Sequence, residues 1–262
     1  MVSSDSFDVH PVLLSEAANH PFDLIGAGHP CAFSWMQITH LAEDNLLTAA
    51  EKWLSPKERL ILDGYTLPRR RREWLAGRLC VKEAVIRLLK KSGIAEPCRT
   101  DISIESDKNG RPFLGFTGST CSHYEISISH SRNQVVGMAS DAWCGIDIQL
   151  LNDTLLTVRD RFCTVKELQM LKSIAADRLT RLGLLWTAKE AIRKCLSAHR
   201  LMGFRQLNLL SGEKVETGFF LDFQLQGPDL PALKSSAIRV VATMKLKYAL
   251  AACVIPGNMN HA

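Results

Sequence analysis

The sequence predicts an α+β protein built from two halves of similar plan, and three observations lead to this fold class. The apolar pattern changes along the chain from a short apolar strand to helical spacing, and then to alternation with a period of two. This order of one strand, helices and several strands occurs twice, with a joint near residues 140–144. With 262 residues, of which 46% are hydrophobic, the chain can form one large domain or two modest ones. We therefore expect an irregular N-terminal arm over 1–30, an N-terminal α+β half over 31–142 and a C-terminal α+β half over 143–262.

The N-terminal half is expected to begin with a strand and two helices. Residues 31–39, CAFSWMQIT, are mostly apolar, as in a buried strand. Apolar side chains at helical spacing predict helices within 41–62. Ser55 before Pro56 is a typical pair of N-cap and first helical residue for the second of them.

A long helix with a basic start is expected next. Four consecutive arginines, Arg69–Arg72, lead into a helix over 73–91 that carries leucine and valine side chains on one stripe. Gly93 follows at the place where a helix commonly ends in a left-handed residue, so we expect it at the C′ position.

The pattern alternates with a period of two after the long helix, which is typical of strands. Residues 101–116 predict a strand, a turn at Asp107–Pro112 and a second strand. Three further strands are expected at 125–131, 135–140 and 144–149. The short link Asp141–Trp143 is typical of a hairpin connection, which would pair the last two of these strands.

The C-terminal half repeats this order of elements. Helices are expected over 155–174 and 177–197. Strands of an antiparallel sheet are expected at 206–210, 218–225, 238–244 and 248–254. No sequence identity between the halves is visible, so the repeat is inferred from the order of elements alone.

The composition excludes several classes of protein. The formal net charge is +5, and no long basic tract with interleaved aromatic side chains occurs, so nucleic acid is not the expected partner. No apolar run approaches the length of a membrane span and the N-terminus lacks the pattern of a secretory signal, so we expect a cytoplasmic protein without a membrane segment. The eight cysteines form no CxxC pair and are expected to be reduced. A compact anionic ligand or an acidic protein suits this charge balance.

A possible metal site is formed by residues from one strand and one helix. Glu190 and Lys194 are four apart and therefore share a helix face with Trp186. Asp147 and Gln149 are two apart and share a strand face. If the strand and the helix meet, the three oxygen-bearing side chains form a cluster that suits Mg²⁺, or Mn²⁺, next to a phosphate-bearing ligand.

Five ordered segments together resemble a known family. They are LAGRLCVKEA at 75–84, GRPFL at 110–114, SISHS at 127–131, GIDIQ at 145–149 and WTAKEAIRK at 186–194. In this order and at these separations they resemble the Sfp-type 4′-phosphopantetheinyl transferases. The resemblance covers residues 55–200 by motif.

The resemblance implies a fold, a reaction and its partners. It implies two α+β halves related by a pseudo-twofold axis, with coenzyme A in the cleft between them. The family transfers the 4′-phosphopantetheine group of coenzyme A to a serine of an apo acyl or peptidyl carrier protein, with Mg²⁺, and releases adenosine 3′,5′-bisphosphate. Since one chain carries both halves, a monomer suffices for a complete cleft.

The resemblance also implies roles for the metal-site residues. Asp147 and Glu190 would hold the cation against the pyrophosphate, and Glu190 is the candidate acceptor of the serine proton. Lys194 would pair with a phosphate oxygen and stabilise the leaving group. Gln149 stands where the family often has Glu, and its amide oxygen can still be a ligand although it brings no charge.

Further residues would bind coenzyme A by resemblance. Ser129 and His130 would contact its phosphates, and His130 would stabilise the developing charge. The turn Asn109, Gly110, Arg111 and Pro112 would pack on the adenine. Arg78 would meet the 3′-phosphate, with Arg72 or Arg71 as a second arginine. Arg69 and Arg70 are expected to be solvated or to present a positive rim to an acidic carrier protein. Lys57 and Arg59 are weaker candidates for the phosphate pocket.

Two other functions stay open at this point. One is a catalytically impaired module that binds coenzyme A and a carrier protein, with Gln149 as the first sign of decay. The other is a different nucleotide-dependent transferase, which would normally carry a GxxxxGK[ST] phosphate loop that this sequence lacks. The sequence leaves the class of carrier open: fatty acid, polyketide or nonribosomal peptide.

Overall fold

A computed structural model describes residues 22, 28–116, 124–197, 202–226 and 237–256. The helices are α1 (Glu43–Trp53), α2 (Pro56–Asp63), α3 (Pro68–Lys91), α4 (Thr154–Val158), α5 (Val165–Met170) and α6 (Arg178–Leu196). The strands are β1 (Cys31–Gln37), β2 (Ile102–Ser106), β3 (Pro112–Phe116), β4 (Glu125–Ser131), β5 (Gln134–Ser140), β6 (Trp143–Leu150), β7 (Leu207–Val215), β8 (Gly218–Leu225), β9 (Ile238–Lys245) and β10 (Tyr248–Ile255). The predicted α+β fold class is confirmed. Most of the predicted arm over 1–30 lies outside the described residues.

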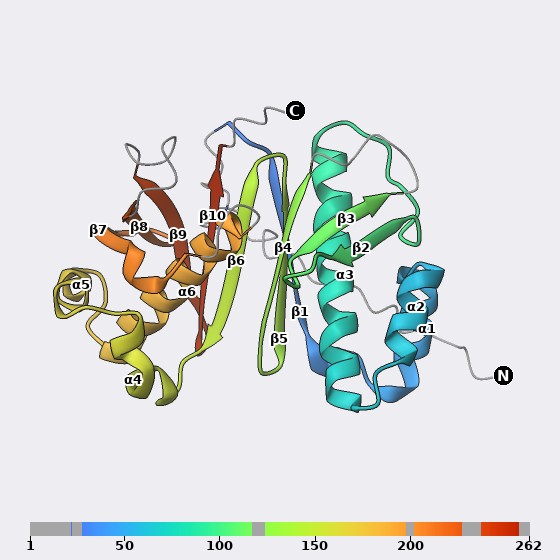
Figure 1. Ribbon diagram of the computed structural model, residues 1–262, viewed down its shortest axis with the longest axis horizontal. Coiled ribbons are helices and arrows are strands. Elements are labelled where there is room, and N and C mark those ends of the chain that lie inside the picture. Colours follow the sequence, from blue (N-terminus) through green and yellow to red (C-terminus); the bar gives the residue numbers. More distant parts are fainter. Residues whose placement is uncertain (1–21, 23–27, 117–123, 198–201, 227–236, 257–262) are drawn as a thin grey trace.

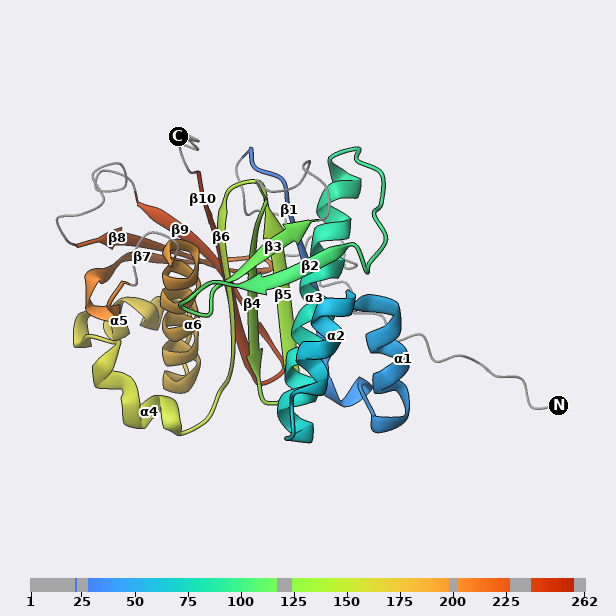
Figure 2. The ribbon, with the colours of Figure 1, turned by 45° about the vertical axis from the view of Figure 1, so that its right-hand side comes forward.

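Two sheets stand back to back, each covered on its outer face by one long helix (Figure 1). The first sheet has the order β1-β5-β4 and carries α3, whereas the second has the order β6-β10-β9-β8-β7 and carries α6. Alternate residues of a strand face opposite sides. Accordingly, Val135 packs in the cluster under α3, while Val136 packs in the cluster that joins the two sheets. The hairpin β2-β3 and the helices α1 and α2 lie around α3 (Figures 1 and 2).

The two sheets meet where β4 and β6 lie side by side (Figures 1 and 2). The predicted hairpin between β5 and β6 is wrong. Both edges of β5 are already hydrogen bonded, to β1 and to β4, so the chain crosses after Ser140 into the second sheet, where β6 pairs with β10. The hairpin partner of β5 is β4, through a two-residue turn at Arg132 and Asn133. A division of the chain between residues 142 and 143 stays a prediction.

The long helix α3 begins earlier than predicted and ends as predicted. Pro68 occupies its first turn, because the missing N–H of proline costs nothing there. Arg69–Arg72 are therefore helical residues rather than the approach to the helix. At the other end Gly93 has a φ of +72°, and the N–H groups of Gly93 and Ile94 donate to Lys90 and Leu89. This is the Schellman geometry that favours glycine at C′.

The remaining sequence predictions concern a helix cap, a helical stretch, the cysteines and membrane segments. Ser55 caps α2 and exchanges hydrogen bonds with Glu58, as expected for a capping box. The predicted helical stretch 155–174 is interrupted, with α4 and α5 as its α-helical parts. All cysteines in the described part of the chain are free thiols. Among the described helices, we find none with the length and apolar character that crossing a membrane requires.

Candidate active site

A glycine lets helix α6 approach β6 closely, and an aromatic cluster anchors the helix to the segments that carry Phe162 and Phe204. A Cβ atom at Gly145 would lie 2.0 Å from the carbonyl oxygen of Ala191, so a larger residue would push the helix away. Trp186 packs edge-on against Phe162 and lies 5.0 Å, between ring centroids, from Phe204. These contacts hold the helix so that Glu190 and Lys194 lie near the seam between β4 and β6.

Lys194 ties the two halves together at this seam. Its Nζ donates to Asp147 Oδ1 at 2.8 Å, to the Ile146 carbonyl at 3.1 Å and to the Ile128 carbonyl at 3.2 Å. An ammonium group has three protons, and all three are used. The sequence predicts that Lys194 and Asp147 lie together, and the structure confirms this. The ammonium group of Lys194 also contacts the backbone of both halves.

Glu190 lies close enough to Asp147 for the two carboxylates to repel one another. Burial raises the pKa of Glu190, and the charge of Asp147 raises it further, while Arg193 and Lys194 oppose the shift. Arg193 Nη1 lies 2.7 Å from Glu190 Oε1, and its Nε donates to the Met202 carbonyl. Two carboxylates brought together with one pKa raised are typical of a functional site.

Sequence reasoning missed Arg193 as a partner of Glu190. The signal was present, because residues three apart on a helix are neighbours. A helix face defined only by residues four apart pairs Glu190 with Lys194 and leaves out Arg193.

The third oxygen donor, Gln149, has a different contact. Its Nε2 donates to the Leu150 carbonyl at 2.9 Å. Within the described residues, no group of three His, Cys, Asp or Glu side chains is arranged to hold a metal ion. The candidate metal site therefore consists of two carboxylates, Asp147 and Glu190, with the amide of Gln149 on the same strand face as Asp147.

Ser129 and His130 face opposite sides of β4. Ser129 is buried and its Oγ donates to Asp147 Oδ1 at 2.7 Å. Burial lowers the pKa of His130; Glu73 opposes the shift, whereas Lys194, Arg70 and Arg69 add to it. At neutral pH His130 is therefore a neutral ring that can donate one N–H.

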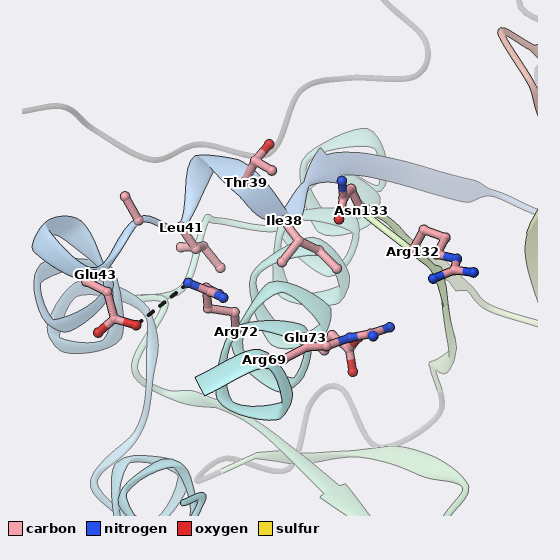
Figure 3. Close-up of a pocket in the computed structure, with 10 residues that line it drawn as sticks. Ile38, Thr39, Leu41, Glu43, Arg69, Arg72, Glu73, Arg132 and Asn133 are labelled. Carbon is pink, nitrogen blue, oxygen red and sulfur yellow. Dashed lines mark hydrogen bonds and ion pairs between the residues drawn. The ribbon is translucent and has the colours of Figure 1, made fainter. Parts of the chain in front are cut away.

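A basic pocket opens beside the end of β4 (Figure 3). It has a volume of about 620 Å³, and its polar lining comes from α3, from the turn after β4 and from the segment between β1 and α1 with the first residue of α1: Arg69, Arg72, Glu73, Arg132, Asn133, Thr39 and Glu43. Arg72 lies 3.7 Å from Glu43, and Arg69 donates to Glu73 at 2.7 Å. Arg132 and Asn133 are pocket residues that sequence reasoning missed, although two polar residues between alternating strands signal a turn.

The predicted phosphate arginines divide between two faces of α3. Arg78 stacks on Trp74 at 4.0 Å, burial lowers its pKa, and its Nε is buried without a partner. Seven residues make almost two helical turns, so Arg71 shares the face of Arg78, and its Nε is likewise buried and unpartnered. Arg72 is turned away from this face, which favours Arg71 over Arg72 as the second arginine.

The turn between β2 and β3 is tight and internally bonded. Asp107 Oδ1 accepts the N–H groups of Asn109 and Arg111, and Gly110 has a φ of +82° that favours glycine. Arg111 forms an ion pair with Glu125 at the start of β4. Hydrogen bonds thus join Asp147, Lys194 and Ser129 into one cluster, to which Glu190 is coupled by charge. Within the described residues, no hydrogen bond or ion pair joins this cluster to Arg78, Arg72 or the turn 109–112.

Comparisons with known proteins bear on this cluster. The model of the 4′-phosphopantetheinyl transferase superfamily matches residues 144–237, which include Asp147, Glu190 and Lys194. The chain is 37% identical over 87 residues to a holo-[acyl-carrier-protein] synthase of Streptococcus agalactiae, covering 32% of this chain and 69% of that protein. The chain belongs to the 4′-phosphopantetheinyl transferase superfamily.

Two further proteins with related names are similar to other shares of the chain. The chain is 33% identical over 120 residues to the 4′-phosphopantetheinyl transferase psf-1 of Bacillus pumilus, covering 45% of this chain and 49% of that protein. The chain thus spans about half of the length of this relative, and 57% of the length of a holo-[acyl-carrier-protein] synthase of Geobacillus. A solved holo-(acyl-carrier-protein) synthase of Bacillus anthracis, in complex with coenzyme A, is 26% identical, with a TM-score of 0.36 over 42% of this chain and 93% of that chain.

Proposed function

We propose that the chain transfers the 4′-phosphopantetheine group of coenzyme A to a serine of an apo acyl or peptidyl carrier protein and releases adenosine 3′,5′-bisphosphate. The observation that carries the proposal is the cluster of Asp147, Glu190 and Lys194 at the seam, in a member of the 4′-phosphopantetheinyl transferase superfamily. The names of the similar proteins from Bacillus pumilus and Streptococcus agalactiae support the same reaction.

The oxygen donors at the seam fit Mg²⁺, and Mn²⁺ as well. The charge of Asp147 raises the pKa of Glu190, and a bound cation would relieve this repulsion. A hard cation prefers such oxygen donors and fills its remaining positions with water and phosphate oxygens. When bound, it would neutralise charge on the pyrophosphate of coenzyme A.

The other groups at the seam act on protons and phosphate oxygens. Glu190, with its raised pKa, is the candidate acceptor of the carrier serine proton, directly or through a water. Lys194 would stabilise the leaving phosphate by exchanging one of its backbone contacts for a phosphate oxygen. His130, as a neutral N–H donor, would bind a phosphate oxygen. The unpartnered Nε atoms of Arg78 and Arg71 suit the 3′-phosphate.

The partner that fits the surface near the pocket is an acidic carrier protein. Arg69 and Arg70 are 69% and 65% exposed at the start of α3, and Arg69 lines the pocket of Figure 3. A positive rim of this kind steers an acidic partner. A monomer in the cytoplasm remains our proposal, and the class of carrier stays open.

The test is the intact mass of a panel of apo carrier proteins after incubation with the chain, coenzyme A and Mg²⁺. A gain of about 340 Da, the mass of one phosphopantetheine group, is expected and should disappear when a chelator is added. No gain on any carrier, while coenzyme A still binds to the chain, would contradict the proposal.

That negative result would favour the second candidate, a module that binds coenzyme A and a carrier protein without turnover. One observation favours it: Gln149 brings no charge, so the site holds only two carboxylates. A direct comparison of coenzyme A binding with carrier modification separates the two candidates.

A further inference from the structure

The seam between β4 and β6 is held by side chains where two neighbouring strands would normally share backbone hydrogen bonds. The strands run in the same direction but belong to different sheets. Serine side chains at alternate positions of β4 accept the N–H groups of β6. The pairs are Ile146 to Ser127 at 3.1 Å, Ile148 to Ser129 at 3.3 Å and Leu150 to Ser131 at 3.0 Å.

These hydroxyls satisfy buried donors while keeping the two backbones a side chain apart. A buried N–H group without a partner is costly, so an edge strand inside a protein needs some acceptor. Here the acceptor is a serine hydroxyl. The ammonium group of Lys194 is the corresponding donor, and it satisfies the carbonyls of Ile128 and Ile146. The seam therefore stays open without leaving these N–H groups unpaired.

Ser129 differs from the other two serines because it also reaches the candidate metal site. A hydroxyl has one proton and two lone pairs. The proton of Ser129 goes to Asp147 Oδ1 at 2.7 Å, and one lone pair takes the Ile148 N–H. The proton is therefore taken by Asp147, and the contact with a phosphate of coenzyme A that the resemblance implies for Ser129 stays a prediction.

The two hydrogen bonds to Asp147 fall on the same oxygen. Ser129 and Lys194 both donate to Oδ1, and within the described residues no donor reaches Oδ2. A carboxylate rotates about its Cβ–Cγ bond unless its oxygens are held. Two donors on Oδ1 fix the plane of the group and leave the lone pairs of Oδ2 available.

We propose that Ser129 is a positioning residue of the metal site: its hydroxyl, held by the Ile148 N–H, fixes Asp147 through Oδ1 so that Oδ2 can bind the cation. This role rests on the proposed function, because it needs a cation at Asp147. Ser127 provides a matched comparison, since it makes the same cross-seam hydrogen bond, is equally buried and within the described residues does not contact a carboxylate.

The test measures Mn²⁺ binding to the full chain by electron paramagnetic resonance, without coenzyme A or carrier protein. Ser129→Ala should weaken binding by about 10- to 100-fold, as is typical when a group that orients a metal ligand is lost. Ser127→Ala should bind like wild type, and Ser129→Thr, which keeps the hydroxyl, should recover most of the loss. Thermal unfolding of all variants checks folding, and both alanine variants should lose similar stability.

Coenzyme A binding in the presence of a chelator gives a second readout. It should be unchanged in Ser129→Ala if the hydroxyl acts on Asp147. Equal loss of Mn²⁺ affinity in Ser127→Ala and Ser129→Ala, or a loss of coenzyme A affinity with normal Mn²⁺ binding, would overturn the positioning role. A wild-type chain that binds no Mn²⁺ would instead contradict the metal-dependent function on which the role rests.

Discussion

The two halves share a buried ion-pair network but differ at the seam. In the N-terminal half, Lys82 on α3 donates to Glu58 of the α2 capping box and to the Trp53 carbonyl, and Glu58 also accepts the Ile104 N–H. In the C-terminal half, the equivalent residues make the same contacts: Lys189 on α6, Glu167 of the α5 capping box, the Phe162 carbonyl and the Leu209 N–H. The same scaffold is therefore built twice.

The positions that form the candidate active site also have counterparts. The hairpins β4-β5 and β9-β10 both turn through a residue of positive φ, Arg132 and Leu246. Ser34 on β1 pairs with the fifth residue after Arg132, and Asp147 on β6 pairs with the fifth residue after Leu246. Ser34 and Asp147 therefore occupy equivalent positions in the two halves.

On the helices, Glu190 and Lys194 correspond to Glu83 and Arg87. Arg87 donates to the Phe33 carbonyl just as Lys194 donates to that of Ile146. The N-terminal half thus has Ser34 where a second carboxylate would be needed. Its Glu83 pairs with Arg87, four residues on, at 2.6 Å, whereas Glu190 pairs with Arg193, three residues on, at 2.7 Å. The comparison teaches that the candidate metal site differs from its structural copy by a carboxylate in place of a hydroxyl and a lysine in place of an arginine.

The largest expected difference between the halves is in activity. Glu190→Gln should lower carrier modification by about 10²- to 10⁴-fold, because the proton acceptor and a metal ligand are lost. Glu83→Gln, its counterpart, should keep activity near wild type. Rates of mass gain on one carrier protein measure both. Activity of Glu190→Gln within a few-fold of wild type would remove Glu190 from the mechanism.

The buried lysines should behave alike. Lys189→Met and Lys82→Met each leave a glutamate buried without its partner, and each should cost about 3–5 kcal/mol of unfolding free energy. Urea denaturation gives the values. Lys57→Met is the control, since this lysine is exposed and pairs with Glu105, and its loss should cost less than about 1 kcal/mol. A small effect at only one of the two buried lysines would show that the networks are not equivalent.

A smaller effect is expected at the uncharged metal position. Gln149→Glu adds a third carboxylate to the C-terminal half and should lower the Mg²⁺ concentration needed for half-maximal activity several-fold. Gln149→Ala serves as the comparison, because it removes the amide oxygen. If both variants show the wild-type metal dependence, Gln149 is not a ligand.

The smallest expected effect is on the pH dependence of stability. The pKa of Glu190 is raised in the folded protein, so the folded chain binds more protons than the unfolded chain just above pH 4.5. The free energy of unfolding contributed by this group therefore falls as pH rises through that window. Glu190→Gln removes the effect, so its stability relative to wild type should increase from pH 4.5 toward neutrality in metal-free buffer. A pH-independent difference would contradict the raised pKa.

Much of the fold could be predicted because periodicity reports local geometry. The capping pair Ser55–Pro56 and the C′ glycine Gly93 were correct, since both depend on neighbouring backbone only. Strand pairing was not predictable in the same way: the short link 141–143 suggested a hairpin, but both edges of β5 are taken by β1 and β4. Periodicity gives the faces of a strand and says nothing about its partners.

The site was predictable where spacing on one element sufficed. Glu190, Lys194 and Asp147 come together as expected from a helix face meeting a strand. The direction of the Ser129 proton was not predictable, because it depends on how two sheets approach each other. Sequence reasoning missed one signal of the repeat. The triplet Lys-Glu-Ala begins at Lys82 on α3 and again at Lys189 on α6.

The most direct test of this account is the anomalous scattering of Mn²⁺ in crystals of the chain grown with coenzyme A. We predict one peak at the seam, in coordination distance of Asp147 Oδ2 and Glu190, and none at the counterpart pair of Glu83 and Arg87. A peak beside Glu83, or bound coenzyme A with no metal at Asp147, would contradict the assignment of the metal site to the C-terminal half.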